Sequence, residues 1–331
     1  MKTPLLQLHD VQQAQLRLRG GVRVTPSRRA ASIAEAIGVE VWLKRDDLQR
    51  TGSFKERGAR NALLCLDDAE RARGVVAASA GNHALGLAFH GGILGVRVTV
   101  VMPANAPAVK VSRCRGLGAD VVLHGQGFEE AQAFAREFSE RTGAIQLHPF
   151  DDPRVIAGQG TMALEILEQV SDFDTLVVPV GGGGLLAGLA TVVKALRPRV
   201  QVIAVEPENA AGFLTACLQG EPRVALLAPT IADGLSVARV GDNTFAIAAG
   251  RVDDVVTVTE REIATAVSWL ARREGIVAEG AGAVAVAALL AGKVTGRSFV
   301  LPIGGRNVDA RHHERIVAEG ELASASLAYA A

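Results

Sequence analysis

Aromatic side chains are scarce in this sequence. Phe, Trp and Tyr together make up 4% of its 331 residues, and Met occurs three times. Hydrophobic residues still reach 49%, and glycine is abundant at 36 residues. A core of this composition must be packed from Ala, Val and Leu, which suits a globular α/β protein long enough for two domains.

Net charge and long apolar runs are also missing. Lys and Arg together number 35, as do Asp and Glu, so the formal net charge is zero and nothing favours binding to nucleic acid or an anionic membrane. No apolar run approaches the roughly 18 residues of a membrane span, and charge begins at Lys2, where a signal sequence would have an apolar core. We expect a cytoplasmic protein that binds neither membrane nor nucleic acid.

Cysteine is rare and dispersed. Cys65, Cys114 and Cys217 lie far apart and form no Cys-x-x-Cys pair. An odd number of separated cysteines indicates neither a zinc site nor a disulfide framework. We expect three small buried residues in a reducing compartment.

Short apolar segments that predict strands alternate with longer segments that predict helices. The predicted strands occupy residues 39–44, 74–78, 96–102, 119–124, 144–147, 175–180, 201–206, 254–258 and 298–301. This alternation is typical of parallel, doubly wound sheets, so we predict two open α/β units. The tail from Leu322 is rich in Ser and Ala and has no amphipathic face, so we expect it to be disordered.

Lys55 lies where a helix is predicted to begin. Ser53 and Glu56 have the spacing of a capping box, which places Lys55 in the first helical turn. The partial positive charge of a helix N-terminus, together with burial, lowers the pKa of a lysine. A neutral lysine amine is a nucleophile toward aldehydes, as in Schiff-base chemistry. Taken alone, the same pattern also fits a surface lysine at the start of an amphipathic helix.

Gly181, Gly182, Gly183 and Gly184 lie between an apolar strand and an apolar helix. Free backbone N–H groups at such a helix N-terminus bind anions, and the absence of Cβ atoms allows close approach, so we predict a bound phosphate. A tight turn would need fewer glycines. Gly182-x-Gly184-x-x-Ala187, with Glu206 at the end of the next strand, also satisfies the dinucleotide fingerprint. That alternative gives no role to Lys55.

The segment Ser79-Ala80-Gly81-Asn82-His83 forms a second strand-to-helix loop. Its small residues leave backbone N–H groups free to bind a carboxylate. Asn82 supplies a neutral side-chain donor, or else caps the helix that follows. For His83 we favour a solvated or packed ring over a catalytic one.

Together these segments resemble the fold-type II pyridoxal-phosphate enzymes, specifically the group of threonine dehydratase (threonine ammonia-lyase) and serine racemase. The resemblance runs from about Thr25 to Asp309. It rests on five segments in the same order: Ser53-Phe54-Lys55-x-Arg57-Gly58-Ala59, Ser79-Ala80-Gly81-Asn82-His83, Val155-Ile156-Ala157-Gly158-Gln159-Gly160-Thr161, Val178-Pro179-Val180-Gly181-Gly182-Gly183-Gly184 and Asn307-Val308-Asp309.

The resemblance implies a tryptophan synthase β-like architecture with pyridoxal 5'-phosphate in the cleft between two domains. Residues 1–70 and 148–321 would form the large, cofactor-binding domain. Residues 71–147 would form a small, mobile domain that binds the substrate, and residues 322–331 a tail. It also implies a homo-oligomer, either a dimer or a tetramer.

The same resemblance implies a role for each site residue. Lys55 would carry the cofactor, Phe54 would lie against its ring, and Asn82 would bond to its ring hydroxyl oxygen. The four glycines would hold the phosphate, while Ser79, Ala80, Gly81, Asn82 and His83 would bind the substrate carboxylate. Lys55 would then remove the Cα proton, and the β-hydroxyl would leave with the cofactor phosphate as acid. The products would be a 2-oxo acid and ammonia.

We therefore predict β-elimination on a small β-hydroxy amino acid, L-threonine first and L-serine second. Four alternatives stay open. Two are enzymes of the same group: a dehydratase for a bulkier β-hydroxy amino acid, and a serine racemase. The others are an NAD-dependent oxidoreductase and a ligand-binding protein without turnover.

Ala80 departs from the serine racemase pattern. Racemases of the group carry a second serine at this position, which acts as acid and base on the face opposite the lysine. Ala80 therefore favours elimination over racemisation. Biosynthetic threonine dehydratases share the Ser-Ala-Gly-Asn-His form but continue into a regulatory domain. This chain stops too early to hold one, so we expect no isoleucine feedback.

Two further departures concern the cofactor ring and a cation. The family usually places Ser, Cys or Thr three residues before the Asn of the last segment, to meet the pyridine nitrogen, but Gly304 stands there. The cation site of the racemase group uses a Glu, a backbone carbonyl and an Asp. Glu206 and Ala210 match the first two ligands, whereas Gly212 replaces the third. Mg²⁺ or another cation would then need water to complete its ligands.

Overall fold

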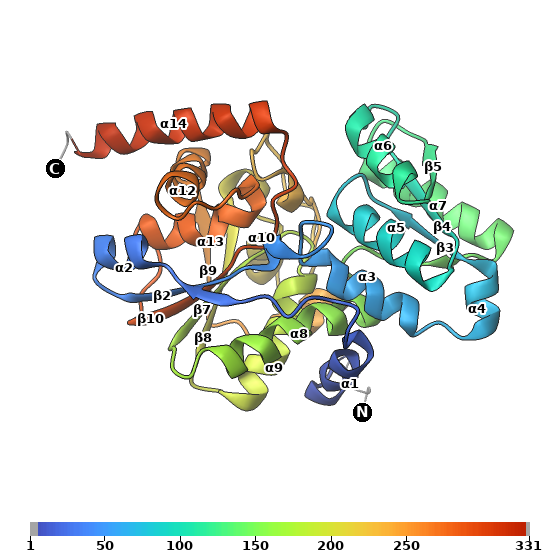
Figure 1. Cartoon of the computed structure of the whole chain (residues 1–331), viewed down its shortest axis with the longest axis horizontal. Coiled ribbons are helices and arrows are strands. Elements are labelled where there is room, and N and C mark those ends of the chain that lie inside the picture. The colour runs from blue at the N-terminus through green and yellow to red at the C-terminus, as the bar shows by residue number, and fades with distance from the viewer. Residues whose placement is uncertain (1–5, 329–331) are drawn as a thin grey trace.

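Runs of Val, Ala and Leu form the strands of two sheets in the computed structural model, which describes residues 6–328 (Figure 1). The larger sheet has the order β1-β2-β10-β7-β8-β9, and the smaller one β5-β4-β3-β6. All described strand pairs are parallel except β1 with β2. The strands are β1 (Ser27–Arg29), β2 (Glu40–Lys44), β3 (Val75–Ala78), β4 (Val98–Met102), β5 (Asp120–Leu123), β6 (Ile145–Gln146), β7 (Thr175–Pro179), β8 (Gln201–Pro207), β9 (Asp254–Val258) and β10 (Ser298–Pro302).

Helices cover both faces of each sheet. In the part of the chain that the structure describes they are α1 (Leu8–Leu18), α2 (Ala31–Ile37), α3 (Lys55–Leu64), α4 (Asp68–Arg73), α5 (Asn82–Leu94), α6 (Ala108–Gly116), α7 (Phe128–Thr142), α8 (Pro153–Gln169), α9 (Gly184–Leu196), α10 (Gly212–Gln219), α11 (Asp242–Ala248), α12 (Glu260–Arg273), α13 (Gly280–Leu290) and α14 (Ala310–Ala328). We call the larger sheet with its helices the six-stranded lobe, and β3 to β6 with α5, α6 and α7 the four-stranded lobe. Figure 1 shows the former on the left and the latter on the right.

Strand β7 shows why its sheet needs helices on both sides. Val177 packs into the core formed with α12 and α13, while Leu176 and Val178 pack into the core formed with α8 and α9. Alternate residues of a strand point to opposite faces, so a strand with five buried residues requires two apolar layers. The helices supply them with small residues; α13, for example, is Ala- and Val-rich and almost entirely buried.

The predicted fold class is confirmed, with local exceptions. Strand β1 was not predicted, because its three residues are polar and partly exposed. Helix α14 continues to Ala328, so the prediction of a disordered tail is wrong for residues 322–328, and residues 329–331 lie outside the described part. Cys114 is buried as expected, but Cys217 is exposed. Within residues 6–328, no helix combines the length and hydropathy needed to cross a membrane.

Candidate active site

One cavity of about 920 Å³ lies between the two lobes, beyond the carboxyl ends of several strands. Crevices at these strand ends are the usual ligand sites of open α/β sheets. The cavity brings together every residue of the lysine, glycine and asparagine segments to which the resemblance gives a role in binding or catalysis. Its lining includes Phe54, Lys55, Ser79, Ala80, Gly81, Asn82, His83, Gly181, Gly182, Gly183, Gly184 and Gly304. Glu206 and Ala210 are not among its lining residues.

Lys55 is the first residue of α3, as predicted, and its amine faces the cavity. Its Nζ donates a hydrogen bond to the backbone oxygen of Pro149 at 2.8 Å and lies 5.4 Å from the centre of the Phe54 ring. Burial lowers the pKa of Lys55 to about 8, although the nearby Glu279 carboxylate opposes the shift. A substantial fraction of neutral amine is therefore present at weakly alkaline pH.

The predicted capping box before Lys55 is wrong. The N-cap of α3 is Phe54, the Ser53 hydroxyl has no hydrogen-bond partner, and Glu56 instead accepts from the backbone N of Thr51 at 2.5 Å. The reason is tertiary: Ser53 forms a β-bridge with Gly305, and the Phe54 N–H donates to the oxygen of Gly304. Backbone pairing therefore fixes the start of the helix, and burial lowers the lysine pKa.

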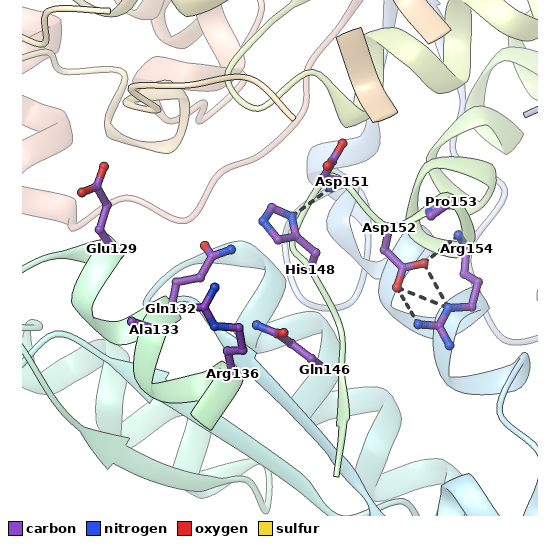
Figure 2. Close-up of a pocket in the computed structure, with 10 residues that line it drawn as sticks. All are labelled: Glu129, Gln132, Ala133, Arg136, Gln146, His148, Asp151, Asp152, Pro153 and Arg154. Atoms are coloured by element: carbon purple, nitrogen blue, oxygen red, sulfur yellow. Dashed lines mark hydrogen bonds and ion pairs between the residues drawn. The ribbon is translucent and has the colours of Figure 1, made fainter. Parts of the chain in front are cut away.

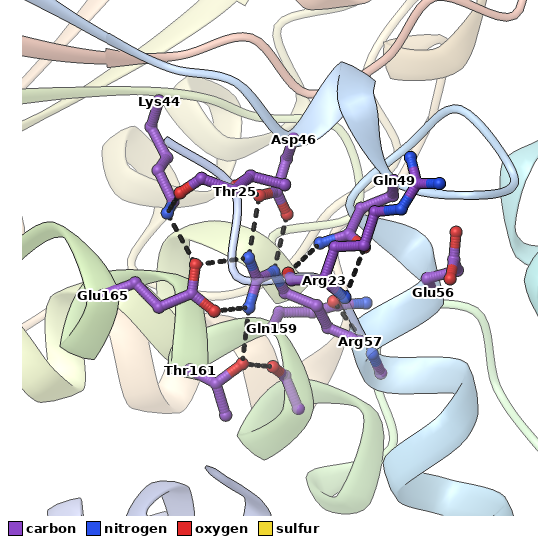
Figure 3. A network of polar contacts seen from close by, with 12 residues as sticks. Arg23, Thr25, Lys44, Asp46, Gln49, Glu56, Arg57, Gln159, Thr161 and Glu165 are labelled. Atoms are coloured by element: carbon purple, nitrogen blue, oxygen red, sulfur yellow. Dashed lines mark hydrogen bonds and ion pairs between the residues drawn. The ribbon is translucent and has the colours of Figure 1, made fainter. Parts of the chain in front are cut away.

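A buried network of four charges anchors α3 behind Lys55 (Figure 3). The guanidinium of Arg57 bonds Asp46 at 2.6 Å and Glu165 at 2.6 Å, and Lys44 reaches the same Glu165 at 2.6 Å. Burial opposes ionisation of Asp46, but the charge of Arg57 outweighs it and holds the pKa of Asp46 below its usual value. Two positive and two negative groups thus compensate one another where water has no access.

Close backbone contact between α3 and α8 explains two glycines of the quoted segments. A Cβ on Gly158 would lie 2.6 Å from the backbone oxygen of Arg57, and one on Gly58 would lie 2.4 Å from the amide of Gln159. Real Cβ atoms do not approach so closely, so larger residues would push the helices apart. The contact holds α3, and with it Lys55, at a fixed distance from α8.

The glycine run connects β7 to α9. Gly183 has φ of +92°, which side chains disfavour, and Cβ atoms on Gly182 and Gly184 would lie 2.2 and 2.7 Å from atoms of Phe150. Within residues 6–328 the N–H groups of Gly181, Gly182 and Gly183 donate to no acceptor. Unpaired donors at the start of a helix fit a phosphate group.

Asn82 and His83 begin α5 at the other wall of the cavity. The alternative of Asn82 as a helix cap is wrong: the cap is Gly81, and the Asn82 amide donates to Glu279 at 2.8 Å. His83 is buried, its ring nitrogens have no hydrogen-bond partner, and burial with the charge of Lys55 lowers its pKa to about 3. The structure therefore agrees with a packed, neutral ring.

Gly304 lies beside the ring of Phe54 in the cavity wall. A Cβ on Gly304 would lie 3.2 Å from the Phe54 ring, so a Ser, Cys or Thr there would require the ring to move.

The carboxylate of Glu206 contacts the start of α10. Its two oxygens accept from the backbone N of Phe213 at 2.7 Å and of Leu214 at 2.8 Å. Burial raises its pKa to about 7. No group of three His, Cys, Asp or Glu residues in the described part of the chain could hold a metal ion. Because Glu206 does not line the cavity, a dinucleotide bound at the glycine run would lack the acidic residue that its fingerprint requires.

Two further titratable groups, Glu279 and His148, lie in the cavity wall without any motif that indicates them. Burial, and then the charge of Asp233, raises the pKa of Glu279 to about 7. Burial, and then the charge of Lys55, lowers the pKa of His148 to about 4. Figure 2 shows His148, which also borders an adjoining pocket of about 670 Å³. A glutamate among small residues at 278–282 was the only local signal for Glu279.

The fold and this cavity define a class of enzyme, and comparison with known proteins agrees. The family model described as pyridoxal-phosphate dependent enzyme matches residues 18–305, so the chain belongs to that family. Its cofactor is pyridoxal phosphate.

Comparison with individual proteins shows which members of the family the chain resembles. The chain is 44% identical over 321 residues to the L-threonine ammonia-lyase of Thermotoga maritima, covering 97% of this chain and 80% of the relative. The structure of the processed form of threonine deaminase isoform 2 from Solanum lycopersicum aligns with a TM-score of 0.88 at 37% identity, covering 96% of this chain and 90% of that one. Serine racemase from Dictyostelium discoideum aligns with a TM-score of 0.87 at 38% identity, covering 92% and 99%.

Proposed function

We propose that this protein removes ammonia from a small β-hydroxy amino acid, with L-threonine as the first substrate and L-serine as the second. The products are a 2-oxo acid and ammonia. The observation that carries the proposal is the deeply placed Lys55, whose pKa is lowered to about 8 by burial, opposite unpaired glycine N–H groups in one cavity. The similarity to threonine ammonia-lyase and threonine deaminase supports the choice of substrate.

The residues present fit the cofactor. Lys55 offers an amine for its aldehyde, Gly181 to Gly184 offer N–H groups for its phosphate, and Phe54 and Asn82 line the space between them. When bound, pyridoxal phosphate supplies an electron sink that acidifies the Cα–H bond of an amino acid. The loop of residues 79–83 binds the substrate carboxylate through its backbone N–H groups.

Lys55 then acts as the base at Cα. Its Nζ takes the Cα proton while the β-hydroxyl leaves with a proton as water. Water is added back at the Cα carbon when ammonia leaves, so the overall reaction is redox-neutral. Ala80 offers no proton donor on the opposite face, and this favours elimination over racemisation.

The two lobes support separate roles in substrate binding and cofactor binding. The strands of the four-stranded lobe all lie between Val75 and Gln146, close to the predicted small domain of residues 71–147. We assign substrate binding and movement to this domain. We assign residues 1–70 and 148–321 to the cofactor-binding domain, which α14 continues to Ala328.

A cytoplasmic homo-oligomer, either a dimer or a tetramer, is part of the proposal. Several large apolar side chains are exposed around α10 and the loop after it, including Leu218 at 76% and Leu226 at 96%. A second copy of the chain would remove this surface from water.

A screen over β-hydroxy amino acids tests the proposal. Protein loaded with pyridoxal phosphate is incubated with each amino acid, and 2-oxo acid release is measured while the visible spectrum is recorded. We expect turnover of L-threonine, followed by L-serine. Absence of 2-oxo acid from every substrate would refute the proposal, and a spectral change without turnover would indicate a ligand-binding protein.

A further inference from the structure

Glu279 joins the two lobes at the cavity wall. It precedes α13 in the six-stranded lobe, and only 7% of its surface is exposed. One carboxylate oxygen accepts from Nδ2 of Asn82, in the four-stranded lobe, at 2.8 Å. The other accepts from the backbone N of Asn307, in the six-stranded lobe, at 3.0 Å. The carboxylate is therefore an acceptor on both sides.

The neighbouring bonds fix the direction of this chain of contacts. Nδ2 of Asn307 donates to Oδ1 of Asn82 at 2.7 Å and to the backbone oxygen of Thr51 at 2.8 Å. An amide NH₂ group has two hydrogens, so both hydrogens of Asn307 are used. Asn82 must then point its oxygen toward Asn307 and its nitrogen toward Glu279. One N–H of Asn82 stays free at the cavity wall.

We propose that Glu279 is a positioning residue, which together with Asn307 fixes the amide orientation of Asn82 and so keeps one N–H of Asn82 available to the cofactor. The inference rests on the proposed function, because the cofactor must occupy this cavity. With its amide reversed, Asn82 would set nitrogen against nitrogen at Asn307 and oxygen against oxygen at Glu279.

Two outer contacts between the lobes cannot replace this arrangement. Lys110 approaches Asp233 at 3.3 Å, and Arg113 approaches Asn307 at 3.1 Å. Both contacts are exposed. The first is an ion pair, and exposed ion pairs contribute little. The second is a hydrogen bond from Arg113 to Oδ1 of Asn307. Neither contact involves the amide of Asn82.

Glu279→Gln is the near-isosteric test. A glutamine has one acceptor oxygen, so it can satisfy either Asn82 or the Asn307 N–H and places its own NH₂ against the other. A buried donor left without an acceptor is costly. We expect Asn82 to be held by Asn307 alone and the affinity for pyridoxal phosphate to fall about tenfold or more.

The double variant Asn82→Asp with Glu279→Gln separates positioning from simple attachment of the lobes. Its glutamine can accept from Asn307 and donate to the aspartate, which restores every bond between the lobes with one donor reversed. The aspartate, however, offers no N–H to the cavity. We expect the unfolding temperature of the cofactor-free protein to recover toward the wild-type value, while cofactor affinity, the visible absorption band and kcat for L-threonine do not.

Glu274→Gln is the matched control. Glu274 is also a buried glutamate that accepts two hydrogen bonds, from the N and Oγ of Ser32, but it does not line the cavity. We expect it to change the unfolding temperature alone. All proteins are compared at pH 8, above the pKa of about 7 to which burial raises Glu279.

Three outcomes would overturn the inference: wild-type affinity and spectrum in Glu279→Gln, recovery of both by the double variant, or a double variant that does not fold. The first outcome would show that Glu279 has no role in cofactor binding. The second would show that Glu279 only attaches the lobes to each other, and the third would contradict the predicted recovery of the hydrogen bonds. A wild-type protein that binds no pyridoxal phosphate would instead refute the proposed function, so the two failures are distinguishable.

Discussion

The amine of Lys55 is held 2.8 Å from the backbone oxygen of Pro149, in the segment that leads from the small sheet into α8. The same amine faces the glycine run across the cavity. The fold therefore places the Lys55 amine and the anion-binding glycine run in one cleft, although they lie about 125 residues apart in the sequence.

The lowered pKa of Lys55 predicts the pH dependence of cofactor loading. Only the neutral amine attacks an aldehyde, and burial brings the pKa of Lys55 to about 8. The neutral fraction therefore rises with pH, and the loading rate of the cofactor-free protein should rise to a plateau with a midpoint near pH 8. Stopped-flow absorbance with added pyridoxal phosphate measures this rate. A midpoint near 10.5, the value of an unperturbed lysine, would contradict the account.

Removing the central cation of the buried network should be costly. Arg57→Met leaves Asp46 and Glu165 facing Lys44 alone, and breaking a buried pair typically costs about 3–5 kcal/mol. Urea unfolding of the cofactor-free protein measures the loss. Arg297→Ala is the control, because its side chain is 94% exposed and its loss should cost less than about 0.5 kcal/mol. Equal stability losses in the two variants would show that the network is not needed.

Ala80→Ser tests why elimination should prevail over racemisation. The variant places a hydroxyl in the cavity wall, where Ala80 offers no proton donor. A positioned acid typically contributes roughly 10²–10⁴-fold, so D-serine formation from L-serine should rise at least about tenfold above a negligible wild-type background. Chiral chromatography after incubation measures the product. Substantial D-serine from the wild-type protein would contradict the role given to Ala80.

The sequence was informative where the signal is local. Alternating apolar segments predicted both sheets, and the glycine run and Lys55 were predicted as residues of one site. Each of these features depends on neighbours in the chain. The capping box failed because the backbone of Ser53 pairs with Gly305, about 250 residues further on. Strand β1 escaped because it depends on its pairing with β2 and not on apolar residues of its own.

Glu279 shows the limit most clearly. Its contact with Asn82 joins positions 197 residues apart, and the contact of Asn82 with Asn307 spans 225. Nothing in a local pattern indicates which oxygen of a buried carboxylate will face which amide. The hydrogen bonds among Glu279, Asn82 and Asn307 form only when both lobes are folded and packed together.

Turnover by Lys55→Ala is the most direct test of the central claim. The variant removes the amine and leaves the glycine run, the Asn82 loop and the buried network unchanged. Release of 2-oxo acid from L-threonine is measured for the wild-type and variant proteins, each supplied with pyridoxal phosphate and checked for intact folding by circular dichroism. We expect turnover by the wild-type protein and a loss of at least about 10²-fold in the variant. An intact Lys55→Ala variant that retains wild-type turnover would contradict the central claim.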